Sequence, residues 1–143
     1  MGWTAVLLAV ALAGVGTVET ETERPYSDND LYVLSHIISA EAGNCGEDMM
    51  IGVGSVVLNR VDDERFPDTI EEVVFQPGQY APTWNGAFYN EPTDEAVEVA
   101  EMLLEDGSQY PPEVIWQSND ILGTIYESID RPPGIGSTMY FCY

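Results

Sequence analysis

The stretch that decides the fold is residues 47–61, EDMMIGVGSVVLNRV. When these residues are placed on a helix, apolar side chains occur almost all the way round. The sequence therefore predicts a helix in the middle of the fold, covered by other elements on most sides. Gly52 and Gly54 interrupt this helix, and each lowers helix stability by about 1 kcal/mol relative to alanine. We expect a neighbouring element to approach the helix closely at these two glycines.

Further helices are predicted on both sides of this central stretch. The helix before it covers residues 31–42. It starts within residues 27–30, SDND, which supply capping side chains and acids for a helix N-terminus. It ends at Gly43-Asn44, a typical C-cap pair. A short helix is predicted over residues 68–75.

The last predicted helix covers residues 94–105 and begins at Thr93, a favourable N-cap residue. Its acids repeat along one side, which indicates a solvated face. After Pro111-Pro112 the hydrophobic period changes to two. Short antiparallel strands are predicted over residues 114–117, 124–126 and 138–143. Helices first and a small sheet late in the chain predict an α+β fold.

Composition excludes several classes of function. The chain has 143 residues, 25 Asp plus Glu against 4 Lys plus Arg, and a net charge of -21, so one domain is expected and binding to nucleic acid is disfavoured. One His and two Cys show no spacing typical of a zinc site, and we expect neither a metal nor a cofactor. No nucleophile elbow, Walker loop or dinucleotide motif is present. Any enzyme chemistry is therefore expected to depend on carboxylates.

The first residues differ in composition from the rest. Residues 3–18 form an uncharged, largely apolar run, which has the length of a secretory h-region. We therefore predict that residues 1–18 are a signal peptide or an N-terminal membrane anchor. Residues 19–26 are predicted to be a linker, and residues 27–143 to be the folded domain.

Glu41 breaks the pattern of its helix. At 100° per residue it lies within about 20° of Leu34 and about 40° of Ile37, on the apolar stripe. It also lies in the last helical turn, where the helix dipole disfavours negative charge. Burial and dipole both raise the pKa of a carboxyl group, as a general acid at neutral pH requires. The alternative is that Glu41 turns to solvent at a frayed helix end.

A loop-rich stretch, residues 76–92, carries four aromatic residues among glycine, proline and asparagine. Such residues either plug the core or form a surface on which sugars stack. Their density favours some exposure. They are Tyr80, Trp84, Phe88 and Tyr89.

Four motifs in order resemble the cell-wall hydrolases of the spore-cortex-lytic type. They are residues 38–43 (ISAEAG), 57–61 (VLNRV), 66–70 (FPDTI) and 76–82 (QPGQYAP). The resemblance covers about residues 31–105 well and the predicted strands loosely. It implies a lysozyme-like domain that cuts the glycan strand of peptidoglycan between N-acetylmuramic acid and N-acetylglucosamine, with Glu41 as the catalytic acid.

The resemblance also suggests which other residues serve the cleft. Asn59, Gln79 and Tyr80 match motif positions expected to line or support it. Trp84, which matches no motif, is a candidate for sugar stacking because it belongs to the aromatic-rich loop. Asn59 has the alternative role of a helix-end cap and Gln79 that of a loop hydrogen-bonder.

Three further residues are expected to lie outside the catalytic machinery. Arg60 is expected to form a structural ion pair, and His36 matches no motif and is interpreted as structural. The family motif I-G-N-H-x-F is altered here, with Thr138 where histidine is common, so no role of that histidine transfers to this chain.

One buried acid suffices for a lytic transglycosylase, whereas glycoside hydrolysis ordinarily uses two carboxylates. No second acid stands out in the sequence, so transglycosylation is preferred. A hydrolytic muramidase or glucosaminidase on the same site is the alternative. A catalytically inert glycan-binding or structural protein of a wall or spore is a further one. We expect a monomer that is secreted or associated with the cell envelope or spore.

Cys45 and Cys142 are the two cysteines of the chain. In an exported protein a pair of cysteines favours a disulfide. This one would tie the last strand to the loop after Glu41. Reduced thiols are the alternative.

Overall fold

The computed structural model describes residues 24–143. The predicted signal peptide or anchor, residues 1–18, and most of the predicted linker lie outside the described residues. Within residues 24–143, no helix combines the length and the hydropathy that a membrane crossing requires.

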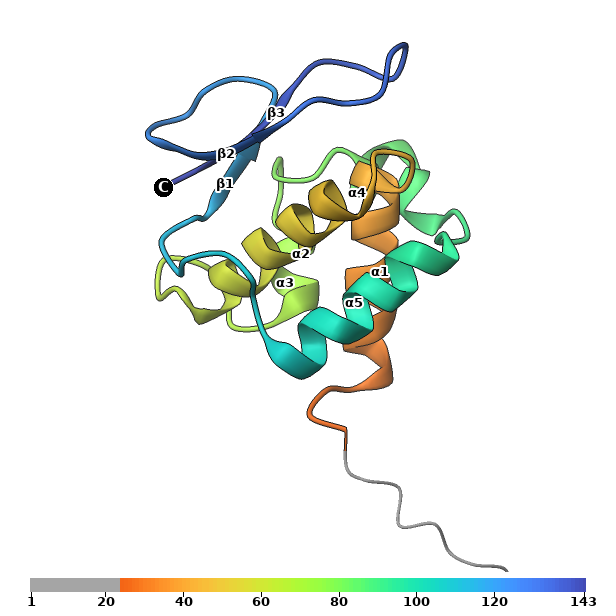
Figure 1. The fold of residues 1–143 in the computed structure, drawn as a ribbon. Helices are drawn as coiled ribbons and strands as arrows, with labels where there is room; N and C mark the ends of the chain where they lie inside the picture. Colours follow the sequence, from red (N-terminus) through yellow and green to blue (C-terminus); the bar gives the residue numbers. More distant parts are fainter. Residues whose placement is uncertain (1–23) are drawn as a thin grey trace, which may run out of the picture.

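Three long helices form the body of the domain: α1 (Asp28–Ala42), α2 (Glu47–Asp62) and α5 (Asp94–Asp106). Each packs against the other two (Figure 1). Helix α1 begins three residues earlier than predicted because Ser27 and Asp30 form a reciprocal capping box, in which each side chain accepts a hydrogen bond from the other's backbone N–H. Thr93 caps α5 as predicted, by accepting a hydrogen bond from the backbone N–H of Ala96.

The close approach expected at the two glycines of α2 is confirmed. A Cβ atom at Gly52 would lie 2.5 Å from the ring of Phe141 in the last strand. A Cβ atom at Gly54 would meet the side chains of Leu103 on α5 and Ile38 on α1. The helix is thus in contact with the sheet on one side and with both long helices on another, which accounts for its nearly uniform apolar character.

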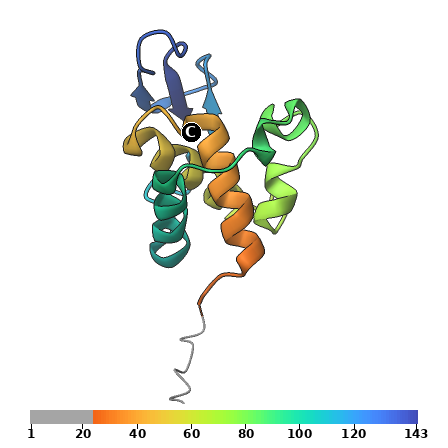
Figure 2. The ribbon, with the colours of Figure 1, turned by 90° about the vertical axis from the view of Figure 1, so that its right-hand side faces the viewer.

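Shorter helices follow α2. Helix α3 (Ile70–Val74) is shorter than predicted because Thr69 is its N-cap and Phe75 its C-cap. Helix α4 (Pro82–Asn85) and the 3-10 helix η1 (Ala87–Tyr89) lie in the aromatic loop. Figure 2 shows α1 between α5 on one side and this group of short helices on the other.

The predicted α+β class is confirmed by a three-stranded antiparallel sheet at one end of the helices (Figures 1 and 2). Its strands are β1 (Trp116–Ser118), β2 (Ile125–Ile129) and β3 (Met139–Cys142). The order is β1-β3-β2, so the last strand is the central one. Met139 and Phe141 of β3 enter the hydrophobic core.

The predicted disulfide is wrong, because Cys45 and Cys142 are both free thiols in the structure. Cys142 is buried in β3, opposite Trp116 of β1 and Ile125 of β2. Cys45 lies in the turn between α1 and α2, which Figure 1 shows on the other side of the molecule from the C-terminal end. Strand pairing holds Cys142 in the central strand, and Cys45 packs against the hydrophobic core at its turn.

Candidate active site

Glu41 lies in the last turn of α1 and lines a cleft of about 340 Å³. The helical part contributes the C-terminal ends of α1 and α2 and the loop before α4. The other part contributes strand β1 with the segment after it, and the segment from β2 to the start of β3. Among the described residues that line it, Glu41 is the only carboxylate. The full lining is Glu41, Arg60, Gln79, Tyr80, Ala81, Trp116, Gln117, Ser118, Asn119, Leu122, Arg131 and Met139.

The electrostatics of Glu41 agree with its position on the apolar stripe. Burial raises the pKa of its carboxyl group above the ordinary value, and the positive charge of Arg131 acts in the opposite direction and is the smaller effect. The helix continues past Glu41 to Ala42. The side chain of Glu41 lines the cleft and does not turn away from it at a frayed helix end.

Arg60, on the last turn of α2, lines the same cleft as Glu41 and is held by several contacts. Its Nε donates to the carbonyl oxygen of Ile115 at 2.8 Å and its Nη1 to Oε1 of Gln79 at 3.4 Å. The side chain is only 3% exposed. Its guanidinium carbon lies 5.1 to 5.5 Å from three ring centroids, those of Phe66, Tyr80 and Trp116.

The expectation that Arg60 forms an ion pair is wrong. The ion pairs within residues 24–143 are Arg24–Asp28 and Arg65–Asp63, and neither involves it. Three aromatic faces and two hydrogen bonds stabilise the buried cation instead. The sequence did not reveal this, because the three rings come from separate parts of the chain.

Gln79 and Tyr80 are brought to the cleft, as the motif predicts. Tyr80 is buried and packs its ring against Arg60. Burial raises the pKa of Tyr80 to about 12, with Arg60 opposing and Glu41 adding to the shift. Its hydroxyl has no hydrogen-bond partner among the described residues.

The structure does not bring Asn59 and Trp84 to the cleft. Asn59 is buried, and its Nδ2 donates to the carbonyl oxygens of Pro111 at 2.8 Å and Val114 at 2.9 Å. It joins the end of α2 to the chain that enters β1. Trp84, in α4, is 61% exposed and is not part of the cleft lining.

Several cleft residues escaped the sequence interpretation, above all Arg131. Its Nη1 donates to Oδ1 of Asn119 at 2.6 Å and to the carbonyl oxygen of Ser137 at 3.0 Å. Thr138, at the altered family motif, donates to Oδ1 of Asp130 at 2.6 Å and so fixes the residue next to Arg131. The sequence contains only four arginines, so testing each of them as a cleft residue could have found Arg131.

His36 has a structural role, as interpreted from the sequence. Its Nδ1 lies 2.6 Å from the carbonyl oxygen of Phe88. Its ring packs against the rings of Tyr32 and Phe88. These contacts join α1 to the aromatic loop. Phe88 is buried there, while Tyr89 is 63% exposed.

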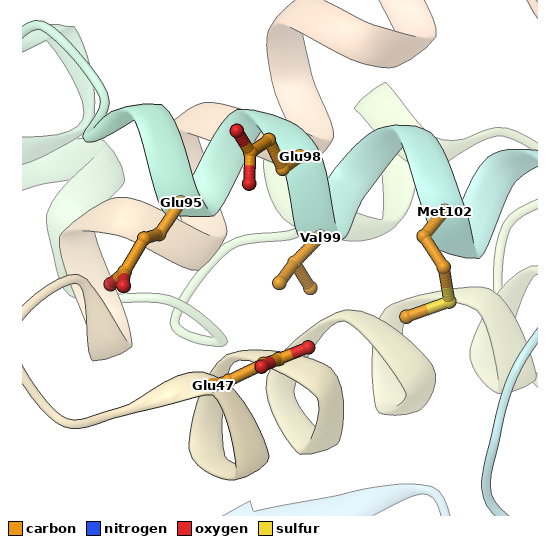
Figure 3. Close-up of a pocket in the computed structure, with 5 residues that line it drawn as sticks. All are labelled: Glu47, Glu95, Glu98, Val99 and Met102. Carbon is orange, nitrogen blue, oxygen red and sulfur yellow. The ribbon is translucent and has the colours of Figure 1, made fainter.

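A second pocket lies between the start of α2 and α5 (Figure 3). Its lining combines the carboxylates of Glu47, Glu95 and Glu98 with the apolar side chains of Val99 and Met102. The part of the chain that the structure describes contains no group of three or more His, Cys, Asp or Glu arranged to hold a metal ion. Glu95 and Glu98 belong to the solvated acidic face of α5, and Glu47 is an exposed residue at the start of α2.

The fold and cleft are those of a small α+β domain with one half-buried glutamate in the cleft. The profile of the cell wall hydrolase family matches residues 45–119, about half of the chain. The chain belongs to this family. Glu41 lies four residues before the matched stretch, so its role is argued from the geometry above.

Individual relatives agree with this assignment. A spore cortex-lytic enzyme of Oceanobacillus iheyensis is 31% identical over 83 residues, which are 58% of this chain and 30% of that protein. The cell wall hydrolase CwlJ of Halalkalibacterium halodurans is 29% identical over 92 residues, 61% of this chain and 64% of that protein. The matched part of the chain thus spans only 24 to 30% of the length of the spore cortex-lytic enzymes.

Solved structures share the fold. The catalytic domain of the germination-specific lytic transglycosylase SleB from Bacillus anthracis superposes with a TM-score of 0.63 at 23% identity, covering 82% of this chain and 97% of that domain. The catalytic domain of the Bacillus cereus SleB protein gives a TM-score of 0.64 at 22% identity, covering 91% of this chain and all of that domain. At these identities the likeness establishes the fold.

Proposed function

We propose that this protein cleaves the β-1,4 bond between N-acetylmuramic acid and N-acetylglucosamine in peptidoglycan, as a lytic transglycosylase with Glu41 as general acid and base. The observation that carries the proposal is Glu41 itself, a half-buried carboxyl group with a raised pKa and the one carboxylate in the described lining of the cleft. A single acid of this kind meets the needs of transglycosylation, whereas hydrolysis ordinarily uses two. The names of the relatives and of the solved SleB domains support the same reaction class.

The proposed reaction begins with proton transfer from the Glu41 carboxyl group to the glycosidic oxygen. The bond from this oxygen to C1 of the muramoyl residue then breaks, and positive charge develops at C1. The Glu41 carboxylate next removes the proton of the muramoyl 6-hydroxyl, whose oxygen bonds to C1. A 1,6-anhydro ring forms, no water is consumed, and Glu41 regains its proton.

Digestion of purified peptidoglycan followed by mass spectrometry of the released fragments tests this reaction. Muramoyl ends lighter by one water than reducing ends are the expected result. Fully hydrated muramoyl ends would identify a hydrolase on the same site. Intact glycan strands after incubation would contradict cleavage and favour the alternative of a catalytically inert glycan-binding protein.

The organisation of the chain follows from this proposal. Residues 27–143 form the catalytic domain, and residues 1–18 act as a signal peptide or membrane anchor joined by the linker 19–26. A peptidoglycan substrate requires the domain to act outside the cytoplasm. Expression of the full chain with a reporter of export, compared with a chain lacking residues 1–18, tests the assignment.

A further inference from the structure

Tyr80 carries a hydroxyl group that makes no hydrogen bond within residues 24–143. The side chain lines the Glu41 cleft and is only 2% exposed, and its hydroxyl oxygen is buried without a partner. A buried hydroxyl that stays unpaired costs folding free energy, and phenylalanine would fill the same space without that cost. In a cleft, one explanation of such a group is a role in the reaction.

Arg60 packs on the ring of Tyr80 but does not engage its hydroxyl proton. The guanidinium carbon lies 5.4 Å from the ring centroid, and Nε and Nη1 donate to Ile115 and Gln79. A guanidinium group has donors only, so the proton of the tyrosine hydroxyl finds no acceptor there. Burial raises the pKa of Tyr80 to about 12 even with this cation beside it. The hydroxyl therefore keeps its proton at neutral pH and remains a donor.

Most of the side-chain acceptors in the described cleft lining already have donors. The acceptors already engaged are those of Gln79, Ser118 and Asn119. Oε1 of Gln117 has no partner in the described chain, and no hydrogen bond contributes to the pKa shift of Glu41. Of these two remaining acceptors, an ionised Glu41 is the stronger, because a charge-assisted hydrogen bond is roughly twice as strong as a neutral one.

From this arrangement we infer that Tyr80 is a positioning residue for Glu41, and that its hydroxyl donates a hydrogen bond to the Glu41 carboxylate once Glu41 has protonated the glycosidic oxygen. The inference rests on the proposed function and assigns a second residue to that reaction. Tyr80 keeps its own proton throughout, and the hydrogen bond holds the carboxylate in place for removal of the proton from the muramoyl 6-hydroxyl. Glu41 is close enough for its charge to raise the pKa of Tyr80.

Tyr80→Phe removes the donor and keeps the ring against Arg60. We expect the cleavage rate kcat to fall about tenfold with little change in KM, as the loss of one charge-assisted hydrogen bond implies. The free energy of unfolding in urea should stay the same or rise, because the variant removes an unpaired buried group. A wild-type rate in Tyr80→Phe would overturn the inference.

The titration of Glu41 provides a readout that a merely structural tyrosine would not move. The charged groups that face Glu41 and Tyr80 are Arg131, from the segment between β2 and β3, and Arg60, from α2, and Tyr80→Phe keeps both. Without the donor the carboxylate is less stabilised, so the pKa of Glu41 should rise by about one unit, equivalent to a tenfold change in the ionisation equilibrium. Carbon-13 NMR of the free protein measures this pKa, and Glu41→Gln identifies the signal.

Tyr110→Phe is the matched control, because Tyr110 is a partly buried tyrosine that does not line the Glu41 cleft. It should change neither the cleavage rate nor the pKa of Glu41. An unchanged or lowered pKa of Glu41 in Tyr80→Phe would overturn the inference, and an unchanged value is also the result expected if the hydroxyl served Gln117 instead.

The inference and the proposed function fail separately. A raised pKa of Glu41 in Tyr80→Phe, together with no cleavage of peptidoglycan by the wild-type chain, would refute the activity and leave the hydrogen bond between the two residues standing. Anhydro products from the wild-type chain, together with an unchanged pKa of Glu41 in Tyr80→Phe, would refute only the role of Tyr80.

Discussion

Glu41 is a half-buried side chain whose pKa is raised by burial, and it lines an open cleft. Replacing it with glutamine keeps the shape and removes the transferable proton. We expect Glu41→Gln to lower the cleavage rate by about 10²- to 10⁴-fold, the usual contribution of general acid–base catalysis. Release of muropeptides, measured by chromatography, gives the rate.

Glu98→Gln is the matched control for this prediction, because Glu98 is an exposed residue of α5 that does not line the Glu41 cleft. It should cleave at the wild-type rate. Unchanged circular dichroism in both variants would show that the fold is intact. Wild-type activity in Glu41→Gln would refute the assigned role.

The raised pKa of Glu41 also predicts the pH dependence of the reaction. The acid is protonated below its pKa, so kcat/KM should fall as the pH rises through the pKa of Glu41 in the free enzyme. This limb should lie above the ordinary glutamate value of 4.5. Arg131 lowers the pKa of Glu41, so Arg131→Gln should move the limb to higher pH. A limb that stays in place or moves to lower pH would contradict the described electrostatics.

At the scale of the elements, a substitution in α2 measures how tightly the helices pack against one another. Gly54→Ala improves helix propensity by about 1 kcal/mol but places a methyl group against Leu103 and Ile38. Overpacking of this kind costs about 1–3 kcal/mol, so we expect a net loss of stability in urea unfolding. Leu103→Ala makes room, and the cost of Gly54→Ala should be smaller in that background. A stabilised Gly54→Ala single variant would show that the packing at this position is loose.

Asn59 joins two elements, and its replacement should therefore affect stability more than chemistry. Asn59→Ala leaves the carbonyl oxygens of Pro111 and Val114 without their donor, at a cost of about 1–3 kcal/mol for an unpartnered buried group. The free energy of unfolding should fall, while KM at a temperature where the variant is folded should stay close to the wild-type value. A large rise in KM with unchanged stability would instead favour the substrate-binding role expected from the motif.

Local patterns in the sequence predicted most of the helices and the position of Glu41. Capping side chains such as Thr93 and the apolar stripe of α1 act within one or two helical turns, and such signals can be read without the fold. Arg60 and Arg131 could not be placed in the same way, because each depends on partners from distant parts of the chain. The proposed disulfide failed for the same reason, since the distance between two cysteines depends on the whole fold.

At the scale of the whole molecule, the negative charge dominates. With a net charge of -21, like charges repel one another across the surface, and screening shortens the range of that repulsion. The midpoint of thermal unfolding should therefore rise as sodium chloride is added at neutral pH. Sucrose at equal osmolality is the control for excluded-solute effects. A midpoint that falls or stays constant with salt would mean that the repulsion between acids contributes little to stability.

The central place of β3 in the sheet has a consequence for synthesis of the protein on the ribosome. Strands β1 and β2 are synthesised first but do not pair with each other. Both form their strand pairing only with residues 139–142 of β3. The cleft lining includes Trp116, Gln117 and Ser118 of β1, so this part of the lining gains its strand pairing only when β3 emerges. A nascent chain can therefore form its helices while part of the cleft lining still lacks its strand pairing.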